Sequence, residues 1–390
     1  MSAMSLPEVL GKICSYLDMQ DVSNFRLCSK AFADVGLRFA YRTVVMSFDS
    51  NQGRPRLRRI VGGVPDPRSF FFTELHVTFD PQHQILQRNT DISCIEEAGC
   101  HFPALEEIIV SSRRRYRGKR SKPTYIYRPD TDDAENGYLK LNGLRQMYSL
   151  LPVIAKADPS LKTFSADGIT YQIVEDPAIT ELRDAFLPCT NATTFKLHVD
   201  TSILTEKAEF HDKNRGLRDL TKSFRQLETL EITIGDYLGW SGPSRYSLEH
   251  IIEPECEWEN LTSLALRGIE CDRRELMTIL KKQKCLNRLC LHDTSLIRSS
   301  WKILLLEMRS SLHSKLKSAC ICGSIQGQQE GGTRPHRESW FLDRRDNHIL
   351  WLAVNICLVS DDTEYAPCPL PREWTDADRI EGEIENFYYV

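Results

Sequence analysis

The side chains best suited to chemistry are cysteines and histidines that stand close together in the chain. Cys290 and His292 are two residues apart in a stretch with strand-like alternation, so both would point to one face of a strand. A thiol beside an imidazole could act as a nucleophile with its base. The third group and the oxyanion donors of such a site are not visible, and Asp293 is expected to point to the opposite face. The sequence therefore predicts no nucleophilic centre here.

Cysteine spacing also predicts no closed metal site. Cys320 and Cys322 share one face of a strand, but no further ligand stands near them in the sequence. Cys94, Cys100 and His101 could hold zinc only with a distant fourth ligand, so core packing is the preferred interpretation. The chain has no Cys-x-x-Cys, no His-Glu-x-x-His, no Gly-x-Ser-x-Gly and no phosphate-cradling glycine loop. We expect no metal, no cofactor and no catalytic residue, and thus no enzyme.

A basic cluster, Arg113–Arg120, opens a charged insertion at residues 111–137 that ends in acidic residues. Such a cluster with a tyrosine could bind nucleic acid or act as a nuclear import signal. A charge-segregated surface loop is preferred, because one cluster on an acidic chain is a weak electrostatic footprint. The acidic end lacks the carboxylates that a calcium loop needs at its third and twelfth places.

Composition is that of a folded protein without a dominant charge. The 390 residues are 41% hydrophobic, and 50 basic against 54 acidic side chains give a net charge of −4, which argues against general binding to nucleic acid or membrane. The start of the chain does not resemble a signal peptide, and the longest apolar run, Ile349–Val359, is too short to span a bilayer. The 13 scattered cysteines are interpreted as reduced thiols. We expect a protein of the cytoplasm, the nucleus or both.

Three apolar residues at the first, fourth and sixth places of a six-residue pattern recur along the chain and indicate short strands. Successive copies begin 25 to 35 residues apart, except for one gap of 56 residues that holds the insertion. Helical stretches at 247–256, 273–282 and 300–312 separate the later copies, which predicts parallel strands joined by helices. The copies are Phe72-Leu75-Val77, Leu105-Ile108-Val110, Leu161-Phe164-Ala166, Ala192-Phe195-Leu197, Leu227-Leu230-Ile232, Leu261-Leu264-Leu266, Leu286-Leu289-Leu291 and, more weakly, Leu316-Ala319-Ile321.

Residues between the apolar positions of each strand would form the opposite, concave face of the sheet. That face is mixed in charge and carries three histidines, and we interpret it as a protein-recognition surface; a solvated sheet without a partner is the alternative. The candidate substrate-binding residues are His76, Lys196, His198, Thr229, Glu231, Arg267, Arg288 and His292.

The first forty-five residues predict three short helices. Ser5 and Glu8 form a capping box, with Pro7 in the tolerant first turn. Asp18 and Ser29 can cap the second and third helices. Helices this short bury only a small core, so several large apolar side chains should remain free for a partner.

This segment resembles an F-box. The resemblance covers about residues 5–45 and rests on Leu6-Pro7-Glu8-Val9-Leu10, Tyr16-Leu17-Asp18 and Arg26-Leu27-Cys28-Ser29-Lys30 with Phe32. Phe32 stands where many members have Trp, and Cys28 where many have Val. The family docks on the Skp adaptor, which links to a cullin scaffold and a ubiquitin-conjugating enzyme. The resemblance implies that the adaptor would be contacted by Leu6, Pro7, Val9, Leu10, Ile13, Leu27, Cys28 and Phe32.

The repeats from Trp258 to Leu306 resemble divergent leucine-rich repeats that follow an F-box in many fungal proteins. The predicted fold is therefore α/β: a three-helix F-box (1–45), an irregular leucine-rich-repeat-like solenoid of parallel strands and helices (46–365), and a C-terminal tail (366–390). Residues 323–338, rich in Gly and Gln, are expected to form a loop. A doubly wound open sheet is the rival, but its strands would be continuous apolar runs rather than alternating ones.

Together these features predict a substrate-recognition subunit of an SCF-type cullin ubiquitin ligase. The F-box would bind the Skp adaptor and the solenoid would hold a protein substrate near the conjugating enzyme. Two alternatives stay open: an F-box scaffold that leads to no degradation, and a nucleic-acid-binding repeat protein that uses the basic cluster.

Overall fold

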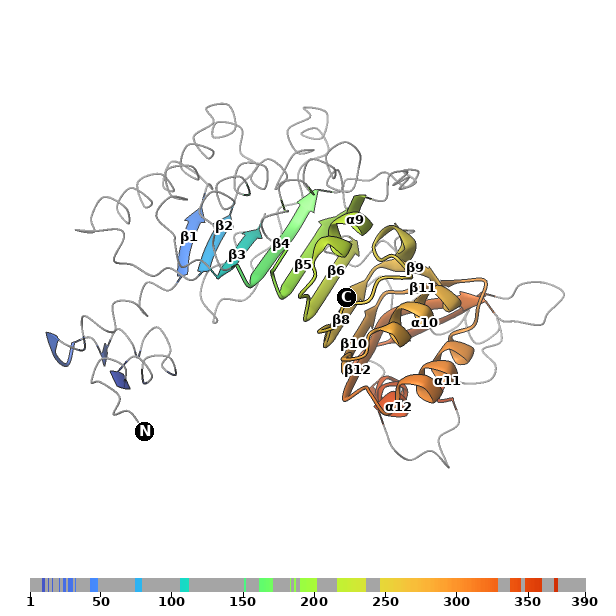
Figure 1. Cartoon of the computed structure of the whole chain (residues 1–390). Helices are drawn as coiled ribbons and strands as arrows, with labels where there is room; N and C mark the ends of the chain where they lie inside the picture. Colours follow the sequence, from blue (N-terminus) through green and yellow to red (C-terminus); the bar gives the residue numbers. More distant parts are fainter. Residues whose placement is uncertain are drawn as a thin grey trace, which may run out of the picture. The chain divides into compact units, whose positions relative to one another are not determined.

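The computed structural model describes two compact units, Met1–Ile203 and Leu204–Val390, which are treated separately here (Figure 1). The described residues are 43–47, 74–78, 106–111, 161–170, 190–201, 216–235, 246–328, 337–344, 348–359 and 368–370, with single positions between 9 and 32 and at 151, 183 and 186. The predicted C-terminal tail beyond residue 370 and all but the first residue of the charged insertion lie outside them.

The first unit contains a sheet of five parallel strands in chain order. They are β1 (Thr43–Ser47), β2 (Glu74–Thr78), β3 (Glu107–Ser111), β4 (Thr163–Thr170) and β5 (Thr194–Asp200). Their register places Leu75 beside Ile108, Ile108 beside Phe164, and Phe164 beside Phe195. The middle residues of successive apolar triplets therefore stand side by side across the sheet. β1 spans the domain boundary predicted after residue 45.

An aromatic cluster forms the core of this unit where β4 and β5 meet. Phe164, Phe186 and Phe195 are fully buried. The ring of Phe186 meets those of Phe164 and Phe195 edge-on, with centroids 4.6 and 5.9 Å apart, whereas Phe164 and Phe195 stack at 6.0 Å. These arrangements are the ones that the quadrupoles of aromatic rings favour.

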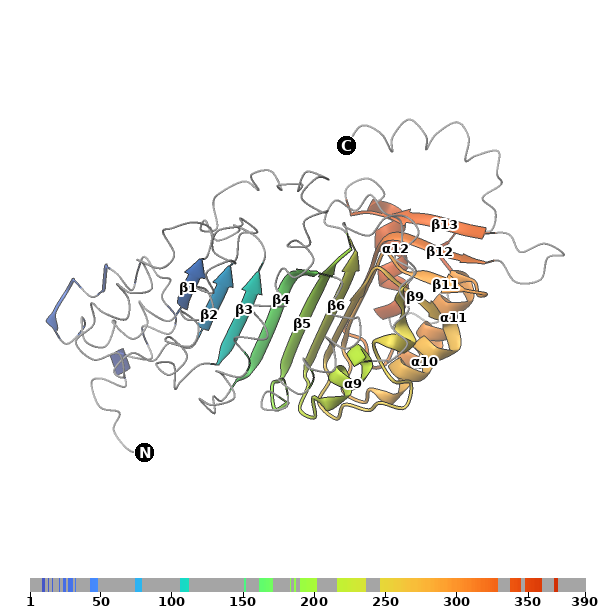
Figure 2. The same cartoon turned by 90° about the horizontal axis from the view of Figure 1, so that it is seen from above.

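The second unit contains two ladders of strands that share one long strand (Figure 2). The first ladder consists of parallel β6 (Thr229–Gly235), β8 (Ser263–Arg267), β10 (Arg288–His292) and the first half of β12 (Ser318–Gln328). The second consists of parallel β7 (Tyr246–Ser247), β9 (Ile269–Asp272), β11 (Ser295–Ile297) and the second half of β12. β13 (Arg337–Leu342) pairs antiparallel with that second half.

A residue in the left-handed region separates the two ladders in three consecutive repeats. Gly268 has φ 69°, Asp293 has φ 50° and Gly323 has φ 76°. The turns also bond to one another: the Gly268 N–H donates to His292 O at 2.9 Å, and the Asp293 N–H donates to Cys322 O at 3.1 Å. A Cβ on Gly268 would lie 1.7 Å from the carbonyl oxygen of Ile234, so only glycine fits there.

Helices of the second unit lie on one side of the first ladder (Figures 1 and 2). They are α9 (Gly216–Ser223), the 3-10 turn η6 (Leu248–His250), α10 (Arg273–Lys282), α11 (Trp301–Leu312) and α12 (His348–Val359). Asp272 caps α10 by accepting from the N–H of Arg274 at 2.7 Å, and Ser300 caps α11 through the N–H of Lys302 at 3.2 Å. Within the described residues, no helix has the length and apolar character needed to cross a membrane.

A buried glutamine fixes the loop that precedes β8. The Gln283 side chain accepts from the N–H of Trp258 at 2.9 Å and donates to Cys256 O at 2.9 Å and to Ile279 O at 3.1 Å. These bonds satisfy a side chain that is completely buried. Gln283 therefore joins the end of α10 to the preceding connection, and the buried Trp258 is held in place.

Helix α12 covers the edge of the first half of β12 that, among the described residues, pairs with no strand. The N–H of Ile321 donates to Asn355 Oδ1 at 2.6 Å, and Asn355 Nδ2 donates to Ile321 O at 3.3 Å and to Trp351 O at 2.7 Å. The amide of Asn355 thus takes the place that a further strand would occupy. A covered edge is protected from pairing with another chain.

The predicted α/β class, a mostly parallel sheet with helices, is confirmed. All eight apolar triplets fall at strands, from β2 to β6 and at β8, β10 and β12, and the predicted helices at 273–282 and 300–312 match α10 and α11. Two local expectations are wrong. Residues 247–256 form only a 3-10 turn, and the predicted loop at 323–338 contains the end of β12 and the start of β13.

We expect Asn355→Ala to lower the free energy of unfolding by about 2–4 kcal/mol, because the N–H and C=O of Ile321 would lose their partners. Urea titration followed by tryptophan fluorescence measures this, since all six tryptophans belong to the second unit. Ile349→Ala is the control on the same helix: its side chain is 83% exposed, so its effect should stay within about 0.5 kcal/mol. Equal losses in the two variants would contradict the edge-covering role.

Candidate functional site

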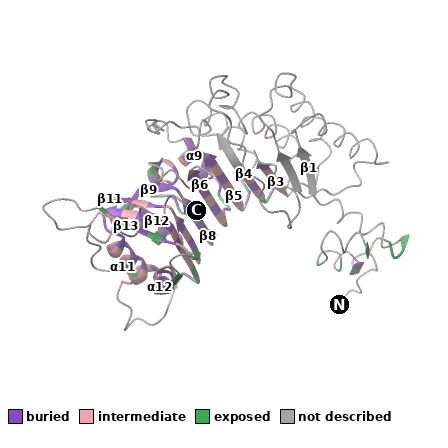
Figure 3. Ribbon diagram, turned by 180° about the vertical axis from the view of Figure 1, so that it is seen from behind, coloured by how far each residue is buried: buried purple, intermediate pink, exposed green. Residues whose placement is uncertain are grey.

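The side of β6, β8, β10 and the first half of β12 that faces away from the helices is named the open face. Along these strands buried and half-buried residues alternate (Figure 3): Leu230, Leu264 and Leu289 are buried, whereas Glu231, Ala265 and Cys290 are half-buried. This alternation agrees with the period-two geometry expected from the sequence. The half-buried row is the surface on which a ligand could be held.

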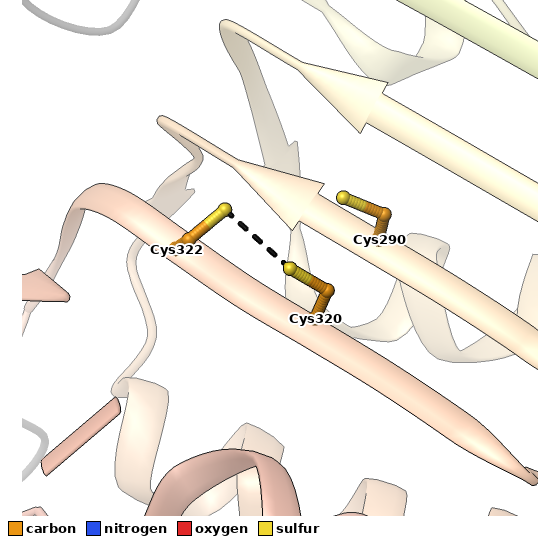
Figure 4. A group of neighbouring side chains, drawn as sticks. All are labelled: Cys290, Cys320 and Cys322. Carbon is orange, nitrogen blue, oxygen red and sulfur yellow. Dashed lines mark hydrogen bonds between the residues drawn. The ribbon is translucent and has the colours of Figure 1, made fainter. Parts of the chain in front are cut away.

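Three cysteines meet on the open face (Figure 4). Cys290 and Cys320 are direct neighbours in the β10–β12 ladder, and Cys322 follows Cys320 on the same face of β12. A hydrogen bond joins the Sγ atoms of Cys320 and Cys322 at 3.7 Å, and all three Sγ atoms lie within 4.8 Å of one another. All three are free, half-buried thiols. We name this group the cysteine trio.

The thiols of the trio differ in acidity because they interact with one another. The pKa of Cys320 is lowered, first by its hydrogen bonds with Cys290 and Cys322 and further by the nearby imidazole of His292. Hydrogen bonds with Cys290 and Cys320, together with burial, raise the pKa of Cys322, and the pKa of Cys290 is also raised, chiefly by its bond with Cys320. The protonation of each thiol therefore depends on that of the other two.

Asp293 is the polar hub at the end of the open face. Its Oδ1 accepts from the N–H of Ser324 at 2.9 Å, and its Oδ2 lies 3.2 Å from Arg267 Nε and 2.6 Å from His292 Nδ1. The expectation that Asp293 points away from His292 is wrong. The left-handed turn at Asp293 swings its carboxylate back toward the preceding residue, which strict strand alternation does not anticipate.

Burial alone would raise the pKa of the Asp293 carboxyl. The contact with His292, the N–H of Ser324 and the guanidinium of Arg267 act in the opposite direction, and the net effect is a lowered pKa. Asp293 therefore carries its charge at neutral pH and contributes to stability in that form.

The structure brings five of the eight candidate substrate-binding residues together on the open face. Thr229, Glu231, Arg267 and His292 are half-buried there, and Arg288 is exposed. The other three belong to the first unit: Lys196 and His198 are half-buried on β5, and His76 lies on β2, where its side chain is outside the description. Sequence reasoning missed Cys290 as a neighbour of Cys320, since 30 residues separate them and only the register of β10 on β12 reveals the pair.

Of the predicted adaptor-binding residues, Leu6 and Pro7 lie outside the described residues. Val9, Ile13, Leu27 and Cys28 are exposed, whereas Leu10 is buried. Phe32 is half-buried and stacks on Phe25 with ring centroids 4.5 Å apart. The cap predicted at Ser29 is present, because its Oγ accepts from the N–H of Phe32 at 3.1 Å.

Two chemistries are available to the open face. A thiol nucleophile would need a histidine base, and His292, in contact with Asp293, lies next to Cys322 in the ladder. Three converging sulfurs, in contrast, are a set of soft metal ligands. The closeness of the three sulfurs makes metal binding the chemistry that this geometry supports directly.

We expect Asp293→Ala to lower the free energy of unfolding by about 2–3 kcal/mol at pH 7. The Ser324 N–H would lose its acceptor, and alanine would be forced into the left-handed region. Asp293→Asn keeps an acceptor and tolerates that backbone conformation, so its loss should be about 1 kcal/mol.

The same Asn variant has a defined pH dependence. The folded pKa of Asp293 is lowered, so the stability that its charge contributes is present at neutral pH and is lost as the pH falls below about 4. The difference in free energy of unfolding between wild type and Asp293→Asn should therefore shrink between pH 7 and about pH 3. A constant difference over this range would contradict the role of the charge.

Comparisons with known proteins identify no family for this chain. No protein-family model matches the chain. No curated protein matches it either. The F-box resemblance therefore rests on the motifs between residues 5 and 45, and what it implies about function is a proposal.

Proposed function

We propose that this protein is the substrate-recognition subunit of an SCF-type cullin ubiquitin ligase. In this proposal residues 1–45 form an F-box that binds the Skp adaptor, and the following repeats form a leucine-rich-repeat-like solenoid that binds a protein substrate. The protein has no chemistry of its own in this role: it raises the concentration of substrate lysines near the conjugating enzyme.

Exposed apolar side chains within the F-box-like motifs are the observation that carries the proposal. The exposed fractions of Val9, Ile13, Tyr16 and Leu27 are 40, 43, 77 and 86%. Several large apolar side chains exposed within one short segment favour burial by a partner. Each is worth roughly 1.5–3 kcal/mol when buried, so a few of them sustain a stable complex.

The repeat of parallel strand, left-handed turn and helix in the second unit supports the solenoid. β8, β10 and β12 follow one another in register, and α10 and α11 connect them. Repeats of this kind bury their leucines against helices and present the opposite face of the strands to partners. The open face, with Arg288 exposed and Glu231, Arg267 and His292 half-buried, would be that recognition surface.

We expect the double variant Ile13→Asp/Leu27→Asp to weaken binding to the Skp adaptor by at least about 100-fold, because two buried anchors together are worth roughly 3–6 kcal/mol. The full chain is co-expressed with the adaptor, and complex formation is measured by gel filtration and calorimetry. Leu306→Asp is the matched control, since Leu306 is a 48% exposed apolar residue on α11. Adaptor binding by the double variant at wild-type strength would remove the basis of the proposal.

Degradation distinguishes a receptor from a scaffold. Proteins captured by the full chain are identified in cells, and their lifetimes are compared with and without this protein. A receptor lengthens the lifetime of its substrate when it is lost, whereas a scaffold leaves its partners unchanged. Retention of nucleic acid with a steep salt dependence would instead favour the nucleic-acid-binding alternative.

A further inference from the structure

The spacing of sulfur atoms in the cysteine trio matches that of a thiolate metal site. Zinc–sulfur bonds of about 2.3 Å in a tetrahedron place neighbouring sulfurs about 3.8 Å apart. The Sγ atoms of Cys320 and Cys322 are 3.7 Å apart, and that of Cys290 lies within 4.8 Å of both. Small rotations of the Cys290 side chain would complete a face of the tetrahedron.

Backbone structure holds these sulfurs in place. Two adjacent strands supply them, and the pairing of Cys290 with Cys320 is one of five consecutive pairs in the β10–β12 ladder. Asn355 fixes the residue between Cys320 and Cys322 by bonding both backbone groups of Ile321. Ligands on such rigid elements lose little freedom when an ion binds.

Packing alone gives a weaker account of the trio. Structural cysteines behave as small hydrophobes and are usually buried, as Cys256, Cys271 and Cys357 are here. The trio, in contrast, is half-buried on the open face. Three polarizable sulfurs in mutual contact at an accessible surface are better explained by a ligand that they share.

A zinc site with three thiolates has a net charge of −1, and charged groups of both signs surround the trio. Arg288 and His292 precede and follow Cys290 on the same face of β10, and Arg267 lies beside His292 on β8. The guanidinium of Arg288 offsets part of the excess negative charge, whereas that of Arg267 is already paired with Asp293. The acidic groups nearby are Glu231, which raises the pKa of Cys290, and Asp293, which contacts His292 and Arg267.

We propose that Cys290, Cys320 and Cys322 bind one zinc ion through three thiolates and leave its fourth coordination position open. Binding replaces the three thiol protons, which pass to solvent, by three zinc–sulfur bonds. Among the described residues, no further His, Cys, Asp or Glu atom joins this group. The fourth position is thus available to water or to a side chain of a bound protein, as in zinc sites with three protein ligands. This inference is independent of the F-box resemblance.

Metal binding to the full chain tests the proposal. Protein purified with a phosphine reductant is titrated with Co²⁺, whose thiolate charge-transfer absorption reports sulfur ligation, and zinc displaces the cobalt to give its affinity. We expect one ion in this site and a loss of affinity of roughly 100-fold or more in Cys290→Ser and Cys320→Ser. Cys285→Ser, which changes an exposed free thiol, should bind as wild type does.

Thiol protection gives a readout that needs no variant. Wild-type protein is alkylated with and without zinc, and the modified cysteines are identified by mass spectrometry. Zinc should protect Cys290, Cys320 and Cys322 and leave Cys28 and Cys285 reactive. Equal alkylation of the trio with and without zinc, or zinc affinity unchanged in both serine variants, would overturn the proposal. A Cys290–Cys320 disulfide that persists under the reductant would also overturn it.

Discussion

The register of the parallel ladder is the constraint on which the second unit depends. Leu230, Leu264, Leu289 and Ala319 stand side by side in β6, β8, β10 and β12. Because side chains alternate along a strand, this register places one row of apolar residues against the helices. The next row, which ends in Cys290 and Cys320, then faces the other way. The register of the ladder thus produces both the core and the open face. A shift of one strand by a single residue would move its apolar side chains from the core to the open face.

Buried polar side chains make hydrogen bonds to backbone groups that the strands and helices of the repeat leave without a partner. Buried Gln283 bonds three backbone groups at the end of α10, and Asn355 bonds two on the edge of β12. Thr221, fully buried on α9, donates its hydroxyl to Ile251 O at 2.6 Å. Unpaired groups in these positions would each cost about 1–3 kcal/mol, so the polar residues select one arrangement of loops around an apolar core.

Periodicity in the sequence is sufficient to locate the longer strands, but it does not predict the short strands, helix α12 or which strands are neighbours. Triplets such as Leu261-Leu264-Leu266 mark β8, because alternation over six residues is a local property. The short strands β7, β9 and β11 have two to four residues each and leave no such pattern. The sequence does not predict α12, because its own residues are apolar on every face of the helix. The helical period of apolar and polar residues is therefore absent. The trio depends on which strands are neighbours, and that is set by the fold of the whole unit rather than by any stretch of sequence.

The departure from glycine at Asp293 links the turn to the open face. Two of three equivalent turns use glycine, at 268 and 323, and the middle one uses an aspartate, which tolerates the left-handed region because its short polar side chain can bond locally. Its carboxylate occupies the space beside Gly323: a Cβ there would lie 2.2 Å from Asp293 Oδ1 and 2.8 Å from His292 Cε1. Glycine is therefore required at 323 for two reasons: its backbone has a positive φ, and any side chain there would clash with the carboxylate of Asp293. Through this fit the turn fixes His292 directly beside Cys322 in the ladder. The aspartate at this turn therefore does what glycine could not: its carboxylate contacts the imidazole of His292 beside Cys322.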